Sequence, residues 1–85
     1  MYKIVYKRDA EKFLKTVPPH EAKKIRVEIE SLAENPRKHG VIKLESSDPA
    51  EYRTRQGNYR IVFSIDDGVL KIVTINRIFS RGAGY

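Results

Sequence analysis

Cysteine is absent from the 85 residues of this chain. The fold therefore contains no disulfide, and no thiolate is available for catalysis or for binding zinc. The two histidines, His20 and His39, lack partners at the spacing of a metal site or a catalytic triad. We therefore expect both on the surface, and we expect no bound metal or other cofactor. A chain without disulfides is typical of a reducing compartment, so we place the protein in the cytoplasm.

Long apolar runs are also missing. No stretch approaches the roughly 18–20 apolar residues that cross a membrane. Charged residues are spread through the start of the chain, unlike the apolar segment of a signal peptide. We therefore expect a soluble protein without a membrane partner. Residues 1–85 should form one small domain, with the modest stability of a chain that buries a limited share of its surface.

Acidic residues are scarce in the second part of the chain. Residues 1–51 carry 11 basic and 9 acidic side chains, whereas residues 52–85 carry 6 basic and 2 acidic ones. Five of those six basic residues are arginines, whose planar guanidinium binds phosphate through two parallel hydrogen bonds. The composition of the second part therefore predicts an anion-binding region, and nucleic acid is the most plausible anion. The alternative is a basic surface that only keeps the protein soluble.

Two helices are predicted in the first part of the chain. The first has Asp9 as its N-cap. Its apolar positions recur at helical spacing, at Ala10, Phe13, Leu14 and Val17. The second runs from about Pro19 to Glu34, because proline suits a first helical turn and Asn35-Pro36 ends the helix. The two form an αα-hairpin with a tight connection.

Strands are predicted on both sides of this helix pair. The extended segments are Tyr2–Tyr6, Val41–Leu44, Tyr52–Gln56, Tyr59–Ile65 and Val69–Ile78. Gly57-Asn58 joins the third and fourth in a hairpin, and Asp66-Asp67-Gly68 forms the next turn. The residues after Ile78 should be irregular. We predict an α+β fold, with the helix pair on one face of a mainly antiparallel sheet of four to five strands. The long path after the first strand permits a parallel pairing.

The hairpin gathers three arginines on one face. Side chains alternate along a strand, so Arg53 and Arg55 point the same way and Thr54 points the other way. Arg60 begins the corresponding face of the next strand. Like charges this close are unfavourable unless an anion or carboxylates lie among them. Two ordinary alternatives remain: the arginines are solvated strand charges, or Arg60 forms a surface ion pair with Glu51 or Asp66.

With these features placed, the chain resembles toxins of the RelE/ParE superfamily from type II toxin–antitoxin modules. The resemblance rests on the helix pair that closes at Glu34-Asn35-Pro36, the hairpin sequence YRTRQGNYRIVFSIDDG, and Arg81 four residues before Tyr85. It is nearest to the RelE-like mRNA interferases, and it implies their microbial-ribonuclease-like fold. It also implies a cytoplasmic, metal-independent endoribonuclease that cleaves mRNA on the ribosome, inhibits translation and is neutralised by a cognate antitoxin protein.

The resemblance also assigns the functional residues by position. It implies that Arg60, Arg81 and Tyr85 are catalytic and that Arg53 and Arg55 bind RNA phosphates. RNA supplies the nucleophile, because its 2′-OH attacks the adjacent phosphate. Arginines suit the negative charge that develops, but their pKa lies above about 12, which makes them poor bases.

Tyr85 is therefore the candidate general base, since neighbouring guanidiniums favour the phenolate form of a tyrosine. Alternatively, Tyr85 stacks on a nucleobase or is simply a frayed terminus. Arg81 is the candidate for stabilising the leaving group or for weak acid catalysis. Two other functions remain open on the sequence: a DNA gyrase inhibitor of the ParE type with the same fold, and a basic RNA-binding module without catalysis.

Overall fold

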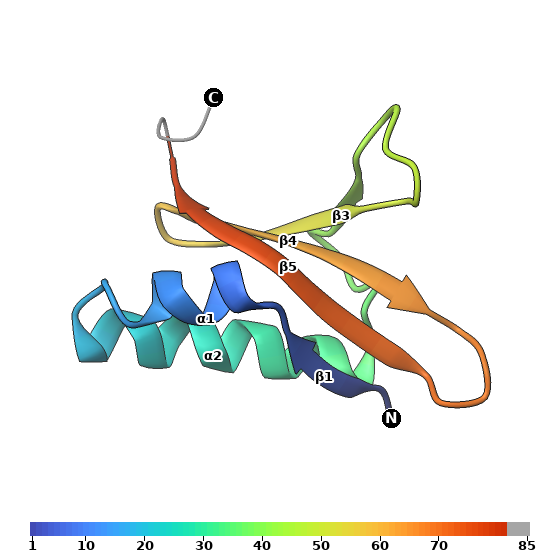
Figure 1. Ribbon diagram of the computed structural model, residues 1–85, viewed down its shortest axis with the longest axis horizontal. Helices are drawn as coiled ribbons and strands as arrows, with labels where there is room; N and C mark the ends of the chain where they lie inside the picture. Colours follow the sequence, from blue (N-terminus) through green and yellow to red (C-terminus); the bar gives the residue numbers. More distant parts are fainter. Residues whose placement is uncertain (82–85) are drawn as a thin grey trace.

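A single five-stranded sheet, in the order β1-β5-β4-β3-β2, organises the computed structural model, which describes residues 1–81. Both helices pack against it, and in Figure 1 they lie together on one side of β3, β4 and β5. The predicted α+β fold is therefore confirmed. Tyr85 lies outside the described residues. The elements are β1 (Lys3–Tyr6), α1 (Arg8–Leu14), α2 (Pro19–Glu34), β2 (Ile42–Lys43), β3 (Tyr52–Gln56), β4 (Tyr59–Asp66) and β5 (Ile72–Ser80).

The helix boundaries agree with the sequence in one helix and differ in the other. Helix α2 begins and ends at the predicted residues. Helix α1 begins at Arg8, with Lys7 as its N-cap, so the prediction that Asp9 caps this helix is wrong. The reason is that the Lys7 carbonyl already accepts the first helical hydrogen bond, from the Glu11 N–H at 3.1 Å. Asp9 instead lies in the first turn, and Val17 lies beyond the helix end.

Strand β5 is displaced toward the C-terminus relative to its prediction. Val69 and Leu70 lie in the turn before it and are 102% and 75% exposed. At the other end, antiparallel pairing with β4 continues as far as Tyr59 and Ser80. The prediction of an irregular tail is therefore wrong for the two residues after Ile78. The cause is non-local, because β4 offers hydrogen-bonding partners up to the hairpin turn.

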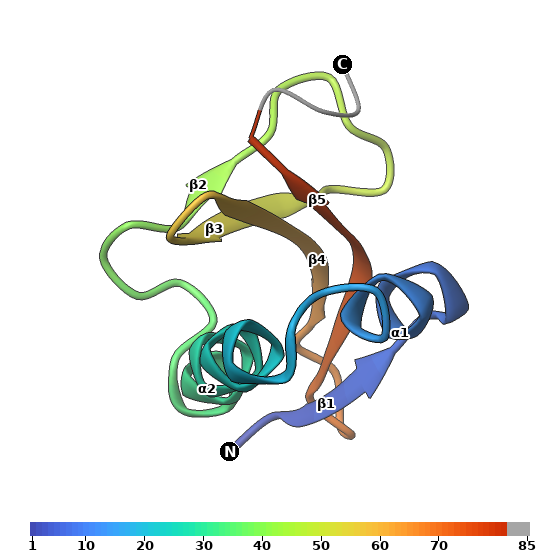
Figure 2. The ribbon, with the colours of Figure 1, turned by 90° about the vertical axis from the view of Figure 1, so that its left-hand side faces the viewer.

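Strand β5 lies between β1 and β4. It pairs antiparallel with β4 and parallel with β1, from Lys3 opposite Ile72 to Tyr6 opposite Ile75, so the parallel pairing that the sequence permits does occur. Figure 2 shows α2 beneath the sheet and α1 beside β5. Apolar residues of these elements form one buried cluster. Its members are Ala10, Leu14, Ile25, Ile29, Leu32, Ile61, Phe63, Val73, Ile75 and Ile78.

A β-bulge interrupts the alternation of β5. Phe63 is opposite Ile75, whereas the preceding residue of β4, Val62, is opposite Arg77, so Asn76 is the extra residue on β5. A bulge of this kind exchanges the two faces of a strand from that point onward. It returns Ile78 to the buried cluster, and it turns Arg77 to the opposite face of the sheet.

A polar contact joins the hairpin to α2. Thr54 on β3 is 3% exposed, and its hydroxyl donates to Glu28 Oε2 at 2.5 Å. The same oxygen lies 2.9 Å from Lys38 Nζ. This contact fixes which face of β3 is turned toward α2 and which is turned away.

We expect Thr54→Val to lower the free energy of unfolding by about 1–3 kcal/mol, because it removes a hydrogen bond to a charged group and leaves Glu28 with one partner fewer. Urea unfolding measures the change. Thr74→Val on β5 is the matched control, since it makes the same chemical change at a half-buried strand position, and it should stay within about 0.5 kcal/mol. Equal effects of the two variants would contradict the role of the contact.

A second polar cluster fastens the β4–β5 turn. Asp67 accepts hydrogen bonds from Arg37 at 2.8 and 3.2 Å and from the Tyr2 hydroxyl at 2.5 Å. The Arg37 guanidinium, and to a lesser degree the Tyr2 hydroxyl, lower the pKa of Asp67 to about 2. The same contact with Asp67 raises the pKa of Tyr2. We call these three residues the turn clamp.

The turn clamp should make stability depend on acidity. A carboxyl whose pKa is lower in the folded protein stabilises it above its unfolded pKa and loses that effect as the pH falls through the folded value. We therefore expect Asp67→Asn to lower the thermal midpoint at pH 6, and this difference from the parent protein should shrink between about pH 4 and pH 2. Thermal unfolding across this range measures it, with Asp48→Asn as the control for losing one exposed carboxylate. A difference that stays constant down to pH 2 would exclude the linkage.

Within residues 1–81, no helix is both long and apolar enough to cross a membrane.

Candidate functional site

The sheet face opposite α2 carries the arginines of the hairpin. Arg55 is directly opposite Arg60 in the pairing of β3 with β4, and Arg53 is opposite Val62. Thr54, between Arg53 and Arg55, points toward α2, so its two neighbours point away. The predicted grouping of three arginines on one face is therefore present. Strand β5 adds Arg77, opposite Val62. We call Arg53, Arg55, Arg60 and Arg77 the arginine face.

A hollow of about 500 Å³ opens on the arginine face. Val62 is only 1% exposed and lies among the residues that line it. Arg53 and Arg60 are half-buried, and their Nε atoms are fully covered. Half-buried guanidiniums hold their orientation better than solvated ones, and a partly desolvated site strengthens their attraction for an anion. The described lining residues are Asp9, Leu44, Arg53, Arg60, Val62, Arg77, Ile78 and Phe79.

Positive charge dominates this hollow. Three of its described lining residues are arginines, and Asp9, near the N-terminus of α1, is the one acid among them. Phe79 is opposite Arg60 in the pairing of β4 with β5, so an aromatic ring borders the basic hollow. Guanidiniums beside an aromatic ring are a combination that suits a nucleic acid strand, since phosphates bind the cations and bases can stack on the ring.

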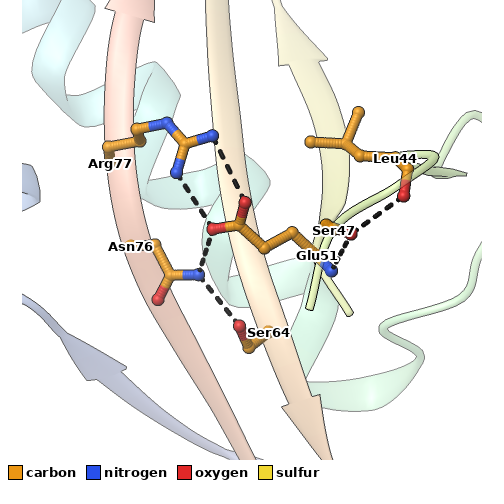
Figure 3. A network of polar contacts seen from close by, with 6 residues as sticks. All are labelled: Leu44, Ser47, Glu51, Ser64, Asn76 and Arg77. Carbon is orange, nitrogen blue, oxygen red and sulfur yellow. Dashed lines mark hydrogen bonds and ion pairs between the residues drawn. The ribbon is translucent and has the colours of Figure 1, made fainter. Parts of the chain in front are cut away.

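Arg77 is held by a carboxylate. Its Nη1 donates to Glu51 Oε2 at 2.9 Å, and its Nη2 donates to Oε1 at 3.3 Å. Asn76 Nδ2 donates to the same Oε2 at 2.9 Å and to Ser64 Oγ at 2.9 Å (Figure 3). Arg77, followed by Asn76, lowers the pKa of Glu51. The carboxylate is therefore ionised at neutral pH and is a poor proton acceptor there.

The other predicted site residues lie near the hairpin turn. Arg55 and Arg81 are exposed, and neither is among the described residues that line the hollow. The backbone N–H of Arg81 donates to the Asn58 carbonyl at 2.5 Å, which brings the end of β5 beside the turn. The structure thus brings Arg53 and Arg60 together in the hollow and places Arg81 beside the hairpin turn. Tyr85 lies outside the described residues and stays a prediction.

Sequence reasoning missed two features of the site. Arg77 lies outside the predicted site, because strict alternation places it on the same face as Val73 and Ile75, whereas the bulge turns it to the arginine face. Asp9, which the sequence predicts as a helix cap, instead lines the hollow. The suggested ion pair between Arg60 and Glu51 is replaced by the pair between Arg77 and Glu51, at 2.9 Å. Asp66 accepts a hydrogen bond from the Gly68 N–H, which is the predicted turn chemistry.

The described residues of this site offer positively charged groups and a shaped surface for binding. His20 and His39 are exposed, as predicted. Among residues 1–81, no group of three or more histidines and carboxylates is placed to hold a metal ion. The described residues can bind an anion, orient it, and stabilise negative charge that develops on it.

Fold and site together define a class: a small basic α+β domain with an arginine-lined hollow on its sheet. A family model described as the ParE toxin of type II toxin–antitoxin systems, parDE, matches residues 4–81. The chain therefore belongs to this toxin family, within the RelE/ParE superfamily. A search of curated proteins finds no match.

Solved structures of toxins agree with this assignment. The chain is similar to the archaeal RelE–RelB complex from Pyrococcus horikoshii, with 27% identity, a TM-score of 0.78, and coverage of 96% of this chain and 97% of that one. It is also similar to the toxin–antitoxin complex RelBE2 from Mycobacterium tuberculosis, with 26% identity, a TM-score of 0.77, and coverage of 94% and 98%. The isolated E. coli RelE toxin, at 18% identity and a TM-score of 0.79 over 95% and 85%, shows the fold alone.

Proposed function

We propose that this toxin is a ribosome-dependent mRNA endoribonuclease that inhibits translation. The observation that carries the proposal is the hollow in which Arg53 and Arg60 are half-buried beside Phe79. Guanidiniums that are partly withdrawn from water attract an anion such as a phosphodiester more strongly than solvated ones do. A surface that only kept the protein soluble would leave its arginines extended in water.

The proposed reaction uses the 2′-OH of the RNA. Its oxygen forms a bond to the adjacent phosphorus, and the bond from phosphorus to the 5′ oxygen breaks. The products are a 2′,3′-cyclic phosphate and a 5′-OH. Arg53 and Arg60 hold the phosphate, and Arg60 stabilises the extra charge as it develops. Arg55, exposed beside Arg60, binds a phosphate at the rim.

Two protons must also move. Tyr85, reacting as the phenolate, takes the proton of the 2′-OH in this scheme and becomes the neutral phenol, and Arg81 stabilises the leaving 5′ oxygen while water returns a proton to it. Both assignments come from the family resemblance, and the position of Arg81 beside the hairpin turn supports its part. A site with so few proton-transfer groups needs a substrate that is already positioned, since positioning alone lowers a barrier by several kcal/mol. The ribosome supplies this positioning.

Primer extension on mRNA tests the proposal. Purified protein should create new 5′ ends on mRNA held in translating ribosomes and should leave the same mRNA almost intact when it is free. Replacing Arg81 and Tyr85 together should remove both the new ends and the growth inhibition. Equal cleavage of free and ribosome-bound mRNA, or no cleavage of either, would overturn the proposal.

An antitoxin partner belongs to the proposal as well. The similar structures from P. horikoshii and M. tuberculosis are complexes of a toxin with its antitoxin. A cognate antitoxin would neutralise this toxin most directly with an acidic segment over the arginine face, because opposite charge speeds and directs association. The net charge of +6 makes the toxin suited to such a partner.

DNA gyrase inhibition is the second candidate, and the match to a ParE family model favours it. The double substitution of Arg81 and Tyr85 separates the two functions. A ribonuclease should lose its toxicity, whereas a gyrase inhibitor should keep its toxicity and induce the DNA damage response. Gyrase supercoiling measured with the purified protein gives an independent answer.

A further inference from the structure

The hydrogen-bond donors around Glu51 form an anion site, and the carboxylate of Glu51 itself occupies it. Two guanidinium nitrogens of Arg77 and the amide nitrogen of Asn76 converge on one carboxylate, at 2.9–3.3 Å. Two parallel N–H donors of an arginine bind carboxylate and phosphate in the same geometry. We call these donors, from Arg77 and Asn76, the anion cradle.

The anion cradle is continuous with the hollow. Arg77 lines the hollow, and Val62 separates it from Arg53 in the cross-strand row. Neighbouring strands lie about 4.8 Å apart, which puts the backbones of Arg53 and Arg77 roughly 10 Å from each other with both side chains on the arginine face. Long guanidinium side chains on such positions can contact adjacent phosphates of one strand.

The carboxylate of Glu51 can move away from Arg77 while the main chain of Glu51 stays in place. Its backbone N–H donates to Ser47 Oγ at 2.9 Å (Figure 3). Its carbonyl accepts from the Leu44 N–H at 2.9 Å. These bonds hold the main chain at the start of β3 whatever the carboxylate does. The side chain of Arg77 is 49% exposed, so an incoming anion can reach its guanidinium from solvent.

We propose that the anion cradle is a second phosphate site, in which an RNA phosphate next to the cleaved one replaces the Glu51 carboxylate on Arg77. Glu51 then acts as an internal competitor that neutralises Arg77 when no RNA is bound. This inference rests on the proposed function, because it takes the hollow to bind the cleaved phosphate. It adds a residue that the family resemblance does not assign.

Binding of a single-stranded RNA that cannot be cleaved tests the proposal. A short 2′-O-methyl RNA blocks the nucleophile, so affinity is measured without chemistry or ribosomes. Arg77→Gln should weaken binding about tenfold and reduce the slope of log affinity against log salt by about 0.7, the loss of one phosphate contact. Glu51→Gln should strengthen binding severalfold, because the competitor is gone. In the Arg77→Gln background, Glu51→Gln should have little further effect.

The turn clamp provides matched controls. Arg37 and Asp67 form an ion pair at 2.8 Å with side chains 48% and 52% exposed, close to the exposure of Arg77, and they do not line the hollow. Arg37→Gln and Asp67→Asn change the net charge by the same amounts as Arg77→Gln and Glu51→Gln. They should change RNA affinity by less than about twofold at physiological salt, where separated charges are screened.

Arg60→Gln distinguishes failure of this inference from failure of the proposed function. Weaker binding with Arg60→Gln, together with an Arg77→Gln effect no larger than that of Arg37→Gln, would overturn the second phosphate site and leave the hollow intact. If the Arg60→Gln variant binds RNA as tightly as the parent protein, and Arg77→Gln has no larger effect than Arg37→Gln, both the second phosphate site and the proposed function fail. Additive effects of Glu51→Gln and Arg77→Gln would likewise refute competition for one site.

Discussion

Replacing Arg60 with glutamine is expected to lower the rate of ribosome-dependent mRNA cleavage by about 10²–10³-fold. The guanidinium is half-buried in the hollow, and glutamine keeps a polar side chain there but carries no charge. A fixed cation aimed at developing negative charge contributes most where water is partly excluded. Cleavage rates measured by primer extension at saturating toxin give the change directly.

Arg26→Gln is the control for this prediction. Arg26 lies on α2, 3.8 Å from Glu11, and contributes nothing to the lining of the hollow. It should leave the cleavage rate within about twofold, because exposed ion pairs have small effects. A similar loss of activity in both variants would show that overall charge matters and that the hollow does not.

Phe63→Ala should cost about 3–5 kcal/mol of stability, the usual effect of removing a buried aromatic side chain. Phe63 is fully buried on β4, and its ring stacks on Tyr52 with centroids 5.9 Å apart. A domain of this length has a total stability of roughly 4–13 kcal/mol. The variant should therefore be close to unfolding at 37 °C, and its thermal midpoint should fall by at least about 12 °C.

Phe63→Leu tests whether the lost volume is the cause. Leucine keeps most of the apolar contact, so this change should cost less than about half as much as alanine. Both variants leave the arginine face untouched, because alternate residues of β4 point to opposite sides. At low temperature, where Phe63→Leu is folded, its RNA affinity should equal that of the parent. A clear loss of affinity would show that the two faces are coupled.

The local elements of this fold can be predicted well from the sequence. Helix α2 begins and ends at the expected residues because proline and Asn35-Pro36 act on their immediate neighbours. The hairpin of β3 and β4 follows likewise from alternation around Gly57, whose φ of +58° suits a tight turn. These features depend on short stretches of chain, and no distant partner is needed to place them.

The features that sequence reasoning missed depend on distant partners. Strict alternation assigns Arg77 to the same face as Val73 and Ile75, and only the register of β5 against β4 shows the bulge at Asn76. The depth of Arg53 and Arg60 in the hollow follows from the same register, which brings Phe79 opposite Arg60. The roles of Arg81 and Tyr85 come from resemblance alone and stay predictions.

The position of β5 between β1 and β4 also determines when a newly made chain can fold. Lys3 pairs with Ile72, so the hydrogen bonds of β1 can form only when β5 is present. Helix α1 packs on β5 as well, and the arginine face is incomplete until Arg77 has joined it. Most of this polypeptide is therefore synthesised before the sheet can close. Pairing between residues so far apart in the sequence slows folding, so we expect the arginine face to be among the last parts of the domain to form.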